Sequence, residues 1–573
     1  MYTKGLVLKS VAALATTLLS VTAMGSPDAV RLSGHVPQRA LIQSVDLGSV
    51  SQTHQMSLAV PLKPRHLAEL QTLIQRLHTP GDALYGKFLT ADEFTARFAP
   101  TQQQYDQVVS SLRAKGFSDI RTNPSRLMVS VHAAAPDVEK AFSVQIHHYR
   151  ATDGRKVFAS AVEPTVDASI SDLIYGVVGL NSFAKAKHYL SHARAQSGSN
   201  PPGNGPDGGG LSAANIKTVY DLNGISQTGT GQTLALAEFD GYTASDITAY
   251  TKQNKLATLN LQNIYIDGMD GTPSSGEDSG AGEVTLDIQL MGALAPAAKI
   301  LVYEAPAPTT DQSFESEEVD VYSRIASDNL AKAVSSSWGS AEDSIQQATM
   351  QSENTSFMQM AAQGQSMFAA AGDSGAYDDG SQLSVDDPGS QPYVTSAGGT
   401  HLNVSSSLAY QSESSWNTST VSSSNGPEGG GGGISTVWTI PSYQQGLGNS
   451  SNQGSTTMRM VPDVALDADP ASGYSTYFEG QWGVVGGTSC VGPLLAAFTG
   501  LVNEARAANG QAALGNFNTA LYKLAASSAY SADFHDVDDN STNLYYPAVT
   551  GYDLSTGWGS IVGQPAFNSL VSQ

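Results

Sequence analysis

A Gly- and Pro-rich stretch, residues 191–210 (SHARAQSGSNPPGNGPDGGG), divides this chain of 573 residues into two parts. The stretch holds too few apolar side chains to build a core, which is typical of a flexible, protease-accessible linker. The chain is also too long for one ordinary hydrophobic core. The sequence therefore predicts two folded units, residues 26–190 and 211–573, joined by this linker.

The two parts carry opposite net charges. Residues 1–210 hold 20 Lys and Arg against 15 Asp and Glu, or +5, whereas residues 211–573 hold 9 against 37, or −28. So few bases leave little self-repulsion after the carboxylates protonate, which favours adaptation to acid; simple solubility is the alternative. Such a charge disfavours nucleic acid and anionic membranes as partners. A basic unit on a cleavable linker is typical of a propeptide, and two domains that stay together are the alternative.

The N-terminus is typical of a secretory signal peptide, residues 1–25. Lys4 and Lys9 precede a short apolar run, VAALATTLLSVTAMG, which ends in small residues. No later stretch resembles a membrane span. We expect a secreted protein, periplasmic or extracellular. The single Cys490 cannot form an internal disulfide and is expected to be a small buried side chain.

Apolar patterns predict the fold class of each unit. In residues 26–190, HLAELQTLIQRLH and QYDQVVSSLRAKG have helical spacing and RLMVSVHAA alternates like a strand, so an α+β unit is expected. Residues 211–573 contain short apolar runs that end in Gly, Ser or Asp, such as TLALAEFD, KILVYEA, KAVSSSWG and QSMFAAAGD, with helical segments between them. This pattern predicts an α/β unit with a mainly parallel sheet, whose chemistry collects beyond the carboxyl ends of the strands.

Two carboxylates four residues apart stand out in GEVTLDIQL. On a helix, Glu283 and Asp287 would share one face, although like charges at this spacing are unfavourable and the neighbouring residues are apolar. The pair must share protons, hold a metal or lie on a solvated acidic face. The segment alone leaves these alternatives open.

A serine and a third carboxylate have positions suited to catalysis. Ser489 follows a Gly-rich turn and precedes a long apolar helix, where it could be a nucleophile or a helix N-cap. Asp373 ends the run MFAAAGD, as a functional group or a turn residue. Only His401 and His535 follow the linker, and neither has an obvious relation to Ser489. A carboxylate base, which works only in acid, becomes an attractive alternative to histidine.

The motifs together resemble the sedolisin family of serine-carboxyl peptidases, which is similar to subtilisin with carboxylates in place of histidine chemistry. They span nearly the whole chain in the family's order: YGKFLTADEFTARFAPT, VYDL, GEVTLDIQL, SSSWG, AAGDSGA, PYVTSAGGT, ISTVW, PDVALDADP, GGTSCVGP, HDV and GYDLSTGWG. The resemblance implies a subtilisin-like α/β catalytic domain preceded by an α+β propeptide domain.

The resemblance implies a role for each matching residue. Ser489 would be the nucleophile, Glu283 its general base, and Asp287 the partner that orients Glu283 and shares its proton. Asp373 would hold the oxyanion and can donate a hydrogen bond only when protonated. Glu238 extends the carboxylate chain in some members; a plain strand-end acid is the alternative. The strand that pairs with substrate would comprise Ser336, Ser337, Trp338 and Gly339, although Trp338 could be ordinary core.

A calcium site is expected near the C-terminus. Asp536 and Asp553 lie among turns rich in carbonyl groups, a hard oxygen set suited to Ca²⁺, with plain acidic turns as the alternative. The resemblance implies one structural ion, bound by these two carboxylates and by the carbonyls of Val537, Val549 and Gly551. The family usually has Gly at the position of Val549, so the site would distort if Val549 could not adopt the required backbone angles.

These features predict a secreted, acid-active endopeptidase of proteins and peptides, expected to be a monomer. Its propeptide would inhibit it until propeptide carboxylates protonate and the zymogen processes itself. Two alternatives remain. One is a calcium-dependent binding protein that kept the fold without activity, and the other is a histidine-based subtilisin-like protease using His401 or His535.

Overall fold

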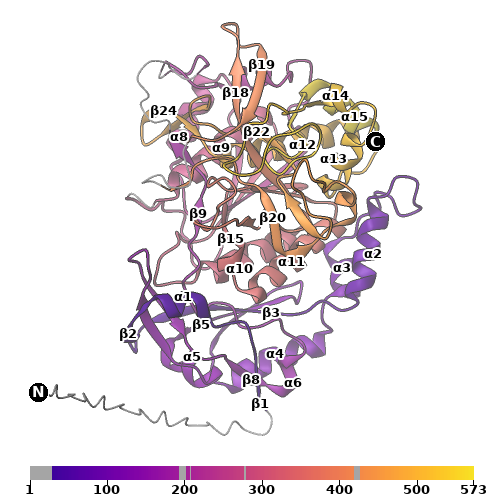
Figure 1. The fold of residues 1–573 in the computed structure, drawn as a ribbon. Coiled ribbons are helices and arrows are strands. Elements are labelled where there is room, and N and C mark those ends of the chain that lie inside the picture. Colours follow the sequence, from indigo (N-terminus) through magenta and orange to yellow (C-terminus); the bar gives the residue numbers. More distant parts are fainter. Residues whose placement is uncertain (1–28, 193–201, 207, 277–278, 419–425) are drawn as a thin grey trace, which may run out of the picture.

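The computed structural model describes residues 29–192, 202–206, 208–276, 279–418 and 426–573. The predicted signal peptide, residues 1–25, lies outside the described residues. Figure 1 shows the N-terminal part, residues 29–192, below the larger C-terminal part, residues 202–573. None of the helices in the described ranges is both long and apolar enough to cross a bilayer.

The N-terminal part is an α+β unit, as predicted. Its two main sheets are antiparallel and three-stranded, in the orders β2-β6-β7 and β3-β5-β4. The strands are β2 (Val45–Ser49), β3 (Gln55–Pro61), β4 (Asp119–Thr122), β5 (Met128–Ala134), β6 (Ile146–Arg150) and β7 (Lys156–Ser160). The longer helices are α2 (Leu67–Leu77), α3 (Ala91–Phe98), α4 (Gln102–Ala114) and α5 (Ala135–Phe142). Capping boxes begin α3 and α4, because Thr90 and Thr101 are followed three residues later by Glu93 and Gln104.

The C-terminal part is built on an eight-stranded, mainly parallel sheet, which confirms the predicted fold class. Its order is β12-β13-β11-β14-β16-β18-β19, and β22 also pairs with β18; among these pairings only β18 with β19 is antiparallel. The strands are β11 (Thr233–Glu238), β12 (Asn260–Tyr265), β13 (Lys299–Glu304), β14 (Ala333–Ser336), β16 (Ser366–Ala370), β18 (Val394–Val404), β19 (Tyr410–Ser415) and β22 (Val464–Asp467).

Strand order reverses direction at β11, since β12 and β13 lie on one side of it and β14 and the later strands on the other. Ligands bind beside such a switch point, outside the carboxyl ends of the strands. Glu238 ends β11 and Ser336 ends β14, so both lie at this position. The topology therefore places the predicted functional residues at the edge of the sheet where a site is expected.

Helices cover both faces of the sheet. Helix α9 (Ala281–Leu294) packs against α12 (Val491–Ala508), which in turn lies over β14 and β16. Helices α10 (Phe314–Asp328) and α11 (Gln347–Ala362) pack together and face the N-terminal part, α10 against β3 and α11 against α2 (Figure 1). Further helices are α7 (Ala213–Val219), α8 (Ala244–Gln253), α13 (Phe517–Ala525) and α15 (Gly563–Ser572).

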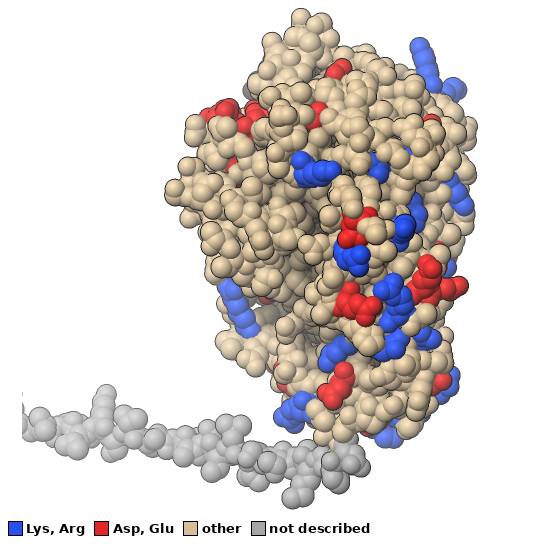
Figure 2. Space-filling model, turned by 90° about the vertical axis from the view of Figure 1, so that its right-hand side faces the viewer, with Lys and Arg blue, Asp and Glu red and all other residues tan. Residues whose placement is uncertain are grey.

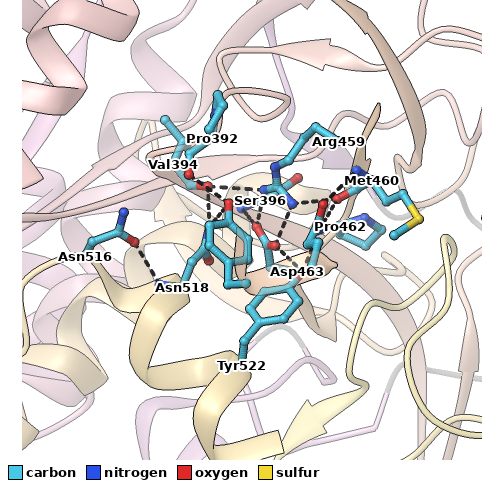
Figure 3. Close-up of polar contacts among 12 residues, drawn as sticks. Pro392, Val394, Ser396, Arg459, Met460, Pro462, Asp463, Asn516, Asn518 and Tyr522 are labelled. Atoms are coloured by element: carbon cyan, nitrogen blue, oxygen red, sulfur yellow. Dashed lines mark hydrogen bonds and ion pairs between the residues drawn. The ribbon is translucent and has the colours of Figure 1, made fainter. Parts of the chain in front are cut away.

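A buried ion pair ties the later strands to β18 (Figure 3). Arg459, in β21 (Met458–Val461), donates to both carboxylate oxygens of Asp463 over 2.5 and 2.8 Å, and both side chains are fully buried. Asp463 also accepts from the main-chain N–H of Ser396 over 2.8 Å and from the Tyr522 hydroxyl over 2.6 Å. Both oxygens of the buried Asp463 carboxylate are thus hydrogen-bonded, as a structural ion pair requires.

Ion pairs join the two parts, and they bear on the expectation that propeptide carboxylates carry the contact. Figure 2 shows one face of the molecule, and most charged side chains on it lie in its lower half, towards the N-terminal part. In five ion pairs between described residues of the two parts, the base belongs to the N-terminal part: Arg39–Asp343, Arg121–Asp267, His132–Asp267, Lys187–Asp378 and His188–Glu283. The interface acids belong to the C-terminal part, so the expectation that propeptide carboxylates carry this contact is wrong.

The described ends of the predicted linker are not free in solvent. Residues Ser191–His192 form β10, which pairs with β24 (Gln481–Gly486), and Gly205 and Gly210 are buried close to Ser475. Glycine is required at Gly210, because its φ of 77° is left-handed and a methyl group there would lie 2.9 Å from the Ser475 nitrogen. The linker's composition hid these contacts, which are made mainly by backbone.

Candidate active site

Helix α9 carries Glu283 and Asp287 through the centre of the C-terminal part. It is buried on nearly all sides, and both carboxylates are 0% exposed. A solvated acidic face, one of the alternatives left by the sequence, is therefore excluded. Two carboxylates one helical turn apart in such surroundings must share protons or be neutralised by a cation.

A third buried carboxylate joins this pair. Glu238, at the end of β11, accepts a hydrogen bond from Trp338 Nε1 over 2.9 Å, and Ser337 Oγ donates to Asp287 over 2.9 Å. Desolvation raises the pKa of both Glu238 and Asp287 well above the ordinary range, and repulsion from Glu283 raises each further. Among the described residues, these three carboxylates form no ion pair with Lys or Arg. Glu238 and Asp287 therefore titrate as a coupled pair.

Ser489 lies in a tight turn directly before α12. Gly487 precedes the turn with a φ of 100°, and Asp373 Oδ1 accepts from both the main-chain N–H and the hydroxyl of Thr488, each over 2.8 Å. Ser489 is buried, and in the described part of the chain its hydroxyl and both Glu283 oxygens have no hydrogen-bond partner. The expected hydrogen bond between Ser489 and Glu283 is thus not formed in this structure, although α9 and the serine turn pack together.

Residues Lys187–His192 of the N-terminal part run through this site in an extended conformation. Residues Lys187–His188 form β9, antiparallel to β15 (Trp338–Ala341), and Ser191–His192 form β10 on β24, so both sides of Tyr189–Leu190 are held by strands. Figure 1 shows β9 beside β15 at the centre of the molecule. The Tyr189 N–H donates to Ser337 O over 3.3 Å, and His188 Nδ1 lies 3.4 Å from Glu283 Oε2.

The carbonyl group of Tyr189 lies beside the serine turn. A methyl group on Gly487 would lie 1.7 Å from the Tyr189 carbonyl oxygen and 2.7 Å from Asp373 Oδ2. The two oxygens therefore border the same small space, which only glycine at position 487 leaves open. Desolvation raises the pKa of Asp373 well above its usual value, so in acid this carboxyl can donate a hydrogen bond to an oxygen placed there.

Comparison with known proteins identifies the family. A model of the pro-kumamolisin activation domain matches residues 43–183, and one of the subtilase family matches residues 269–559. Sedolisin of Pseudomonas sp. (strain 101) is 32% identical and covers 96% of this chain and 94% of its own. Kumamolisin of Bacillus sp. (strain MN-32) is also 32% identical, with 94% and 96% covered. The chain belongs to the sedolisin family.

A solved structure agrees with this assignment. Pseudomonas sedolisin, a serine-carboxyl proteinase complexed with two molecules of pseudo-iodotyrostatin, matches with a TM-score of 0.56 and 30% identity, over 65% of this chain and 100% of that one. Tripeptidyl-peptidase 1 of Rattus norvegicus is more distant, at 25% identity over 92% of this chain and 93% of its own. As a sedolisin-family member with an activation domain, the chain is a serine-type peptidase made as a zymogen.

The two histidines of the C-terminal part have partners other than Ser489. His401 Nδ1 lies 2.9 Å from Asp469 Oδ2, and the His535 ring stacks on Tyr410 with 3.6 Å between ring centroids. Cys490, next to the nucleophile candidate, is fully buried, and desolvation raises the pKa of its thiol well above the ordinary range. A protonated, buried thiol fits packing rather than chemistry.

The four residues expected to bind substrate have different surroundings. Trp338 and Gly339 belong to β15 and pair with β9, whereas the Ser337 side chain bonds Asp287 and its carbonyl accepts from Tyr189. Ser336 accepts from the Tyr322 hydroxyl over 3.0 Å, inside the core. Sequence reasoning missed the segment Lys187–His192 and the role of Thr488. The position of KHYL directly before the Gly-rich linker was the available signal for the segment.

The residues expected to bind calcium form one loop cluster. The buried carboxylate of Asp553 accepts from Val549, Ser555 and Thr556 N–H groups, and Asp536 accepts from the Gly551 N–H over 2.9 Å. Desolvation raises the pKa of Asp553 to about 7, and a cation would instead stabilise its charged form. Gly551 has a φ of 82°, whereas Val549 is not among the described residues with positive φ, so valine is compatible with the loop. Two carboxylates among loop carbonyl groups are oxygen ligands of the kind that Ca²⁺ takes, although the described residues hold no group of three or more His, Cys, Asp or Glu that could bind a metal ion.

Proposed function

We propose that this sedolisin is a secreted, acid-active endopeptidase that cleaves proteins through an acyl-enzyme on Ser489. The observation that carries the proposal is the peptide segment lying across the serine turn, next to three buried carboxylates without a Lys or Arg partner among the described residues. Uncompensated buried acids are unfavourable for stability and are therefore expected to serve chemistry.

In the proposed mechanism, Ser489 attacks the carbonyl carbon of the bound peptide while Glu283 takes the proton of its hydroxyl. Asp287 orients Glu283 and shares its proton, and Glu238 extends the chain, held by Trp338. The oxyanion forms in the space between Gly487 and Asp373, whose protonated carboxyl donates to it. Glu283 returns the proton to the leaving amine, and a water activated by Glu283 then hydrolyses the ester.

In the zymogen, the segment Lys187–His192 would occupy the active site like a bound substrate and so inhibit the enzyme. We propose the Tyr189–Leu190 bond as the first maturation cut, just before the linker 191–210; the pairings of β9 and β10 on either side of it, and the Tyr189 carbonyl beside Gly487, support this proposal. Acid release would act on the C-terminal part's interface acids. Protonation of Asp267 would abolish its 3.1 Å ion pair with Arg121, one of the contacts between the two parts.

The bound segment favours an endopeptidase over a tripeptidyl exopeptidase. Ser340 Oγ donates to the carbonyl of Lys185 over 2.5 Å, which lies four residues before Tyr189. The site thus holds chain well beyond three residues on the amino side of the scissile bond. An enzyme that releases tripeptides needs that side closed after the third residue.

A structural Ca²⁺ ion is proposed at Asp536, Val537, Val549, Gly551 and Asp553. When bound, it would fix the C-terminal loops by neutralising the two carboxylates. Chelation should then lower the unfolding temperature of the wild-type enzyme but not of Asp553→Asn, and an equal effect on both would contradict the assignment.

One experiment tests the catalytic proposal. The full-length zymogen is shifted to pH 4, and its products are followed by mass and N-terminal sequencing. The wild type should yield a mature chain that begins at Leu190 before any trimming and that cleaves an unfolded protein at internal bonds, whereas Ser489→Ala should do neither. Continued self-processing of purified Ser489→Ala would refute the mechanism, and release of tripeptides alone would refute the endopeptidase assignment.

A further inference from the structure

The side chain of His188 reaches from the bound segment to the proposed base. His188 lies opposite Trp338 in the pairing of β9 with β15, and the two rings meet edge-on with 5.6 Å between their centroids. The Nδ1 atom of His188 lies 3.4 Å from Glu283 Oε2. Because side chains alternate along an extended strand, those of its two neighbours point the other way. The position directly before Tyr189 is therefore the one whose side chain contacts Glu283.

Glu283 belongs to a group of acids that attracts a cation. It is 0% exposed and faces the buried carboxyls of Asp287, Glu238 and Asp373; desolvation raises the pKa of each, and the charge of Glu283 raises it further. Within the described ranges, no Lys or Arg forms an ion pair with any of these four groups. A protonated imidazole beside Glu283 supplies positive charge and is therefore favourable.

A second histidine of the segment faces the same carboxylate from β10. Desolvation and the charge of His188 lower the pKa of the His192 imidazole, whereas the charge of Glu283 raises it. The proposed cut after Tyr189 removes His188 with the propeptide and leaves His192 on the mature chain. Of the two histidines, His188 is thus the one whose effect on Glu283 ends with maturation.

We infer that His188 slows self-processing of the zymogen by pairing with the proposed base, and that histidine at P2, the position before the residue whose carbonyl is attacked, makes a bound peptide a poor substrate. The inference rests on the proposed function, because it takes Glu283 as the base and Tyr189–Leu190 as the bond that is cut. A carboxylate paired with an imidazolium is a weaker base, and its paired oxygen is not available to the Ser489 hydroxyl. This accounts for the absence of a Ser489–Glu283 hydrogen bond among the described residues.

The first test compares full-length zymogens at pH 4, where an ordinary imidazole is protonated. His188→Gln should cut the Tyr189–Leu190 bond about 10- to 100-fold faster than the wild type. Its mature enzyme has the wild-type sequence, so an equal specific activity after processing shows that the variant folded. His147→Gln is the matched control and should process at the wild-type rate, because His147 pairs with Asp46 over 2.9 Å within the N-terminal part. Processing of folded His188→Gln no faster than the wild type would overturn the inference.

The second test uses mature wild-type enzyme and the peptides Lys-X-Tyr-Leu-Ser-His at pH 4, in which X is His, Gln or Nδ1-methylhistidine. Histidine should lower kcat by about 10- to 100-fold relative to Gln without raising KM, because the loss is in the chemical step and not in binding. Nδ1-methylhistidine keeps the ring but cannot donate from Nδ1, so its kcat should exceed that of histidine. Cleavage of the Tyr-Leu bond with the same kcat in all three peptides would overturn the inference. Failure to cut any peptide, with the zymogens also uncut, would instead refute the proposed function.

Discussion

Two buried carboxylates of this protein, Asp463 and Glu283, differ in whether their oxygens have hydrogen-bond partners. Asp463 is paired with Arg459 and accepts further hydrogen bonds from Ser396 and Tyr522, so each of its oxygens is satisfied (Figure 3). Glu283 is equally buried, yet neither of its oxygens has a hydrogen-bond partner among the described residues, and the ion pair that it forms, with His188 over 3.4 Å, is with the N-terminal part. The first arrangement stabilises a fold, and the second leaves the base without a cation from its own domain. The difference separates acids that hold the structure from acids proposed to work.

Glu283→Gln should have the largest effect, and it should be on activity alone. Loss of the proposed base is expected to lower the first-order rate of zymogen self-processing at pH 4 by about 10⁴-fold. Glutamine has the same shape and carries no charge, so the free energy of unfolding in urea should stay within about 1 kcal/mol of the wild type or rise. A large loss of stability, with processing retained, would make Glu283 a structural acid like Asp463.

Arg459→Met should show the reverse pattern. It leaves Asp463 buried without its cation, which typically lowers the free energy of unfolding by about 3–5 kcal/mol. The measurement is urea unfolding of the purified zymogen at pH 6. Arg459→Met combined with Asp463→Leu serves as control, because removal of both partners should recover much of the loss. If Arg459→Met is as stable as the wild type, the pair contributes little and the contrast with Glu283 fails.

Substitution of Asp373 should have the next largest effect on activity, and it tests whether the protonated carboxyl acts as a hydrogen-bond donor. Asp373→Ala removes the proposed oxyanion donor and should slow self-processing by about 10²- to 10³-fold. Aspartic acid donates only when protonated, so the wild type loses this donor as pH rises through its raised pKa. Asp373→Asn donates at every pH, and the ratio of its rate to that of the wild type should increase from pH 3 to pH 7. A ratio independent of pH would exclude proton donation by Asp373.

Sequence reasoning reached the fold and the helix that carries Glu283 and Asp287 because both depend on local patterns. The apolar runs of β11, β13 and β16 and the spacing of Glu283 and Asp287 are visible within a few residues. The segment Lys187–His192 was missed, since only the tertiary fold brings β9 beside β15 and β10 beside β24. The interface acids were assigned to the wrong side for the same reason. Which of two charged surfaces supplies the carboxylate depends on docking, not on composition.

The large number of acidic residues after Gly210 also has a different explanation from the one that composition suggested. Of the 37 Asp and Glu after Gly210, at least 20 are buried, so the count of acids overstates the negative charge at the surface. Burial raises the pKa of Glu315 to about 7, of Glu304 to about 8 and of Asp387 to about 6. Buried acids of this kind are protonated in acid, which favours the folded state there.

The smallest predicted effect follows from one such group, Glu315. Its pKa is higher in the folded than in the unfolded chain, so its stabilising contribution is complete below about pH 4 and is lost as pH rises through about 7. The free energy of unfolding of the wild type should therefore fall between pH 4 and pH 8, by about 3 kcal/mol from Glu315 alone. Glu315→Gln keeps an acceptor for the Thr349 hydroxyl and should flatten the profile by that amount. Arg459 and Asp463 provide the comparison: their double replacement should leave the slope between pH 4 and pH 8 unchanged, because an acid held by a cation does not need a proton to stay buried. An equal change of slope in both variants would mean that the unpaired acids are not the source of acid stability.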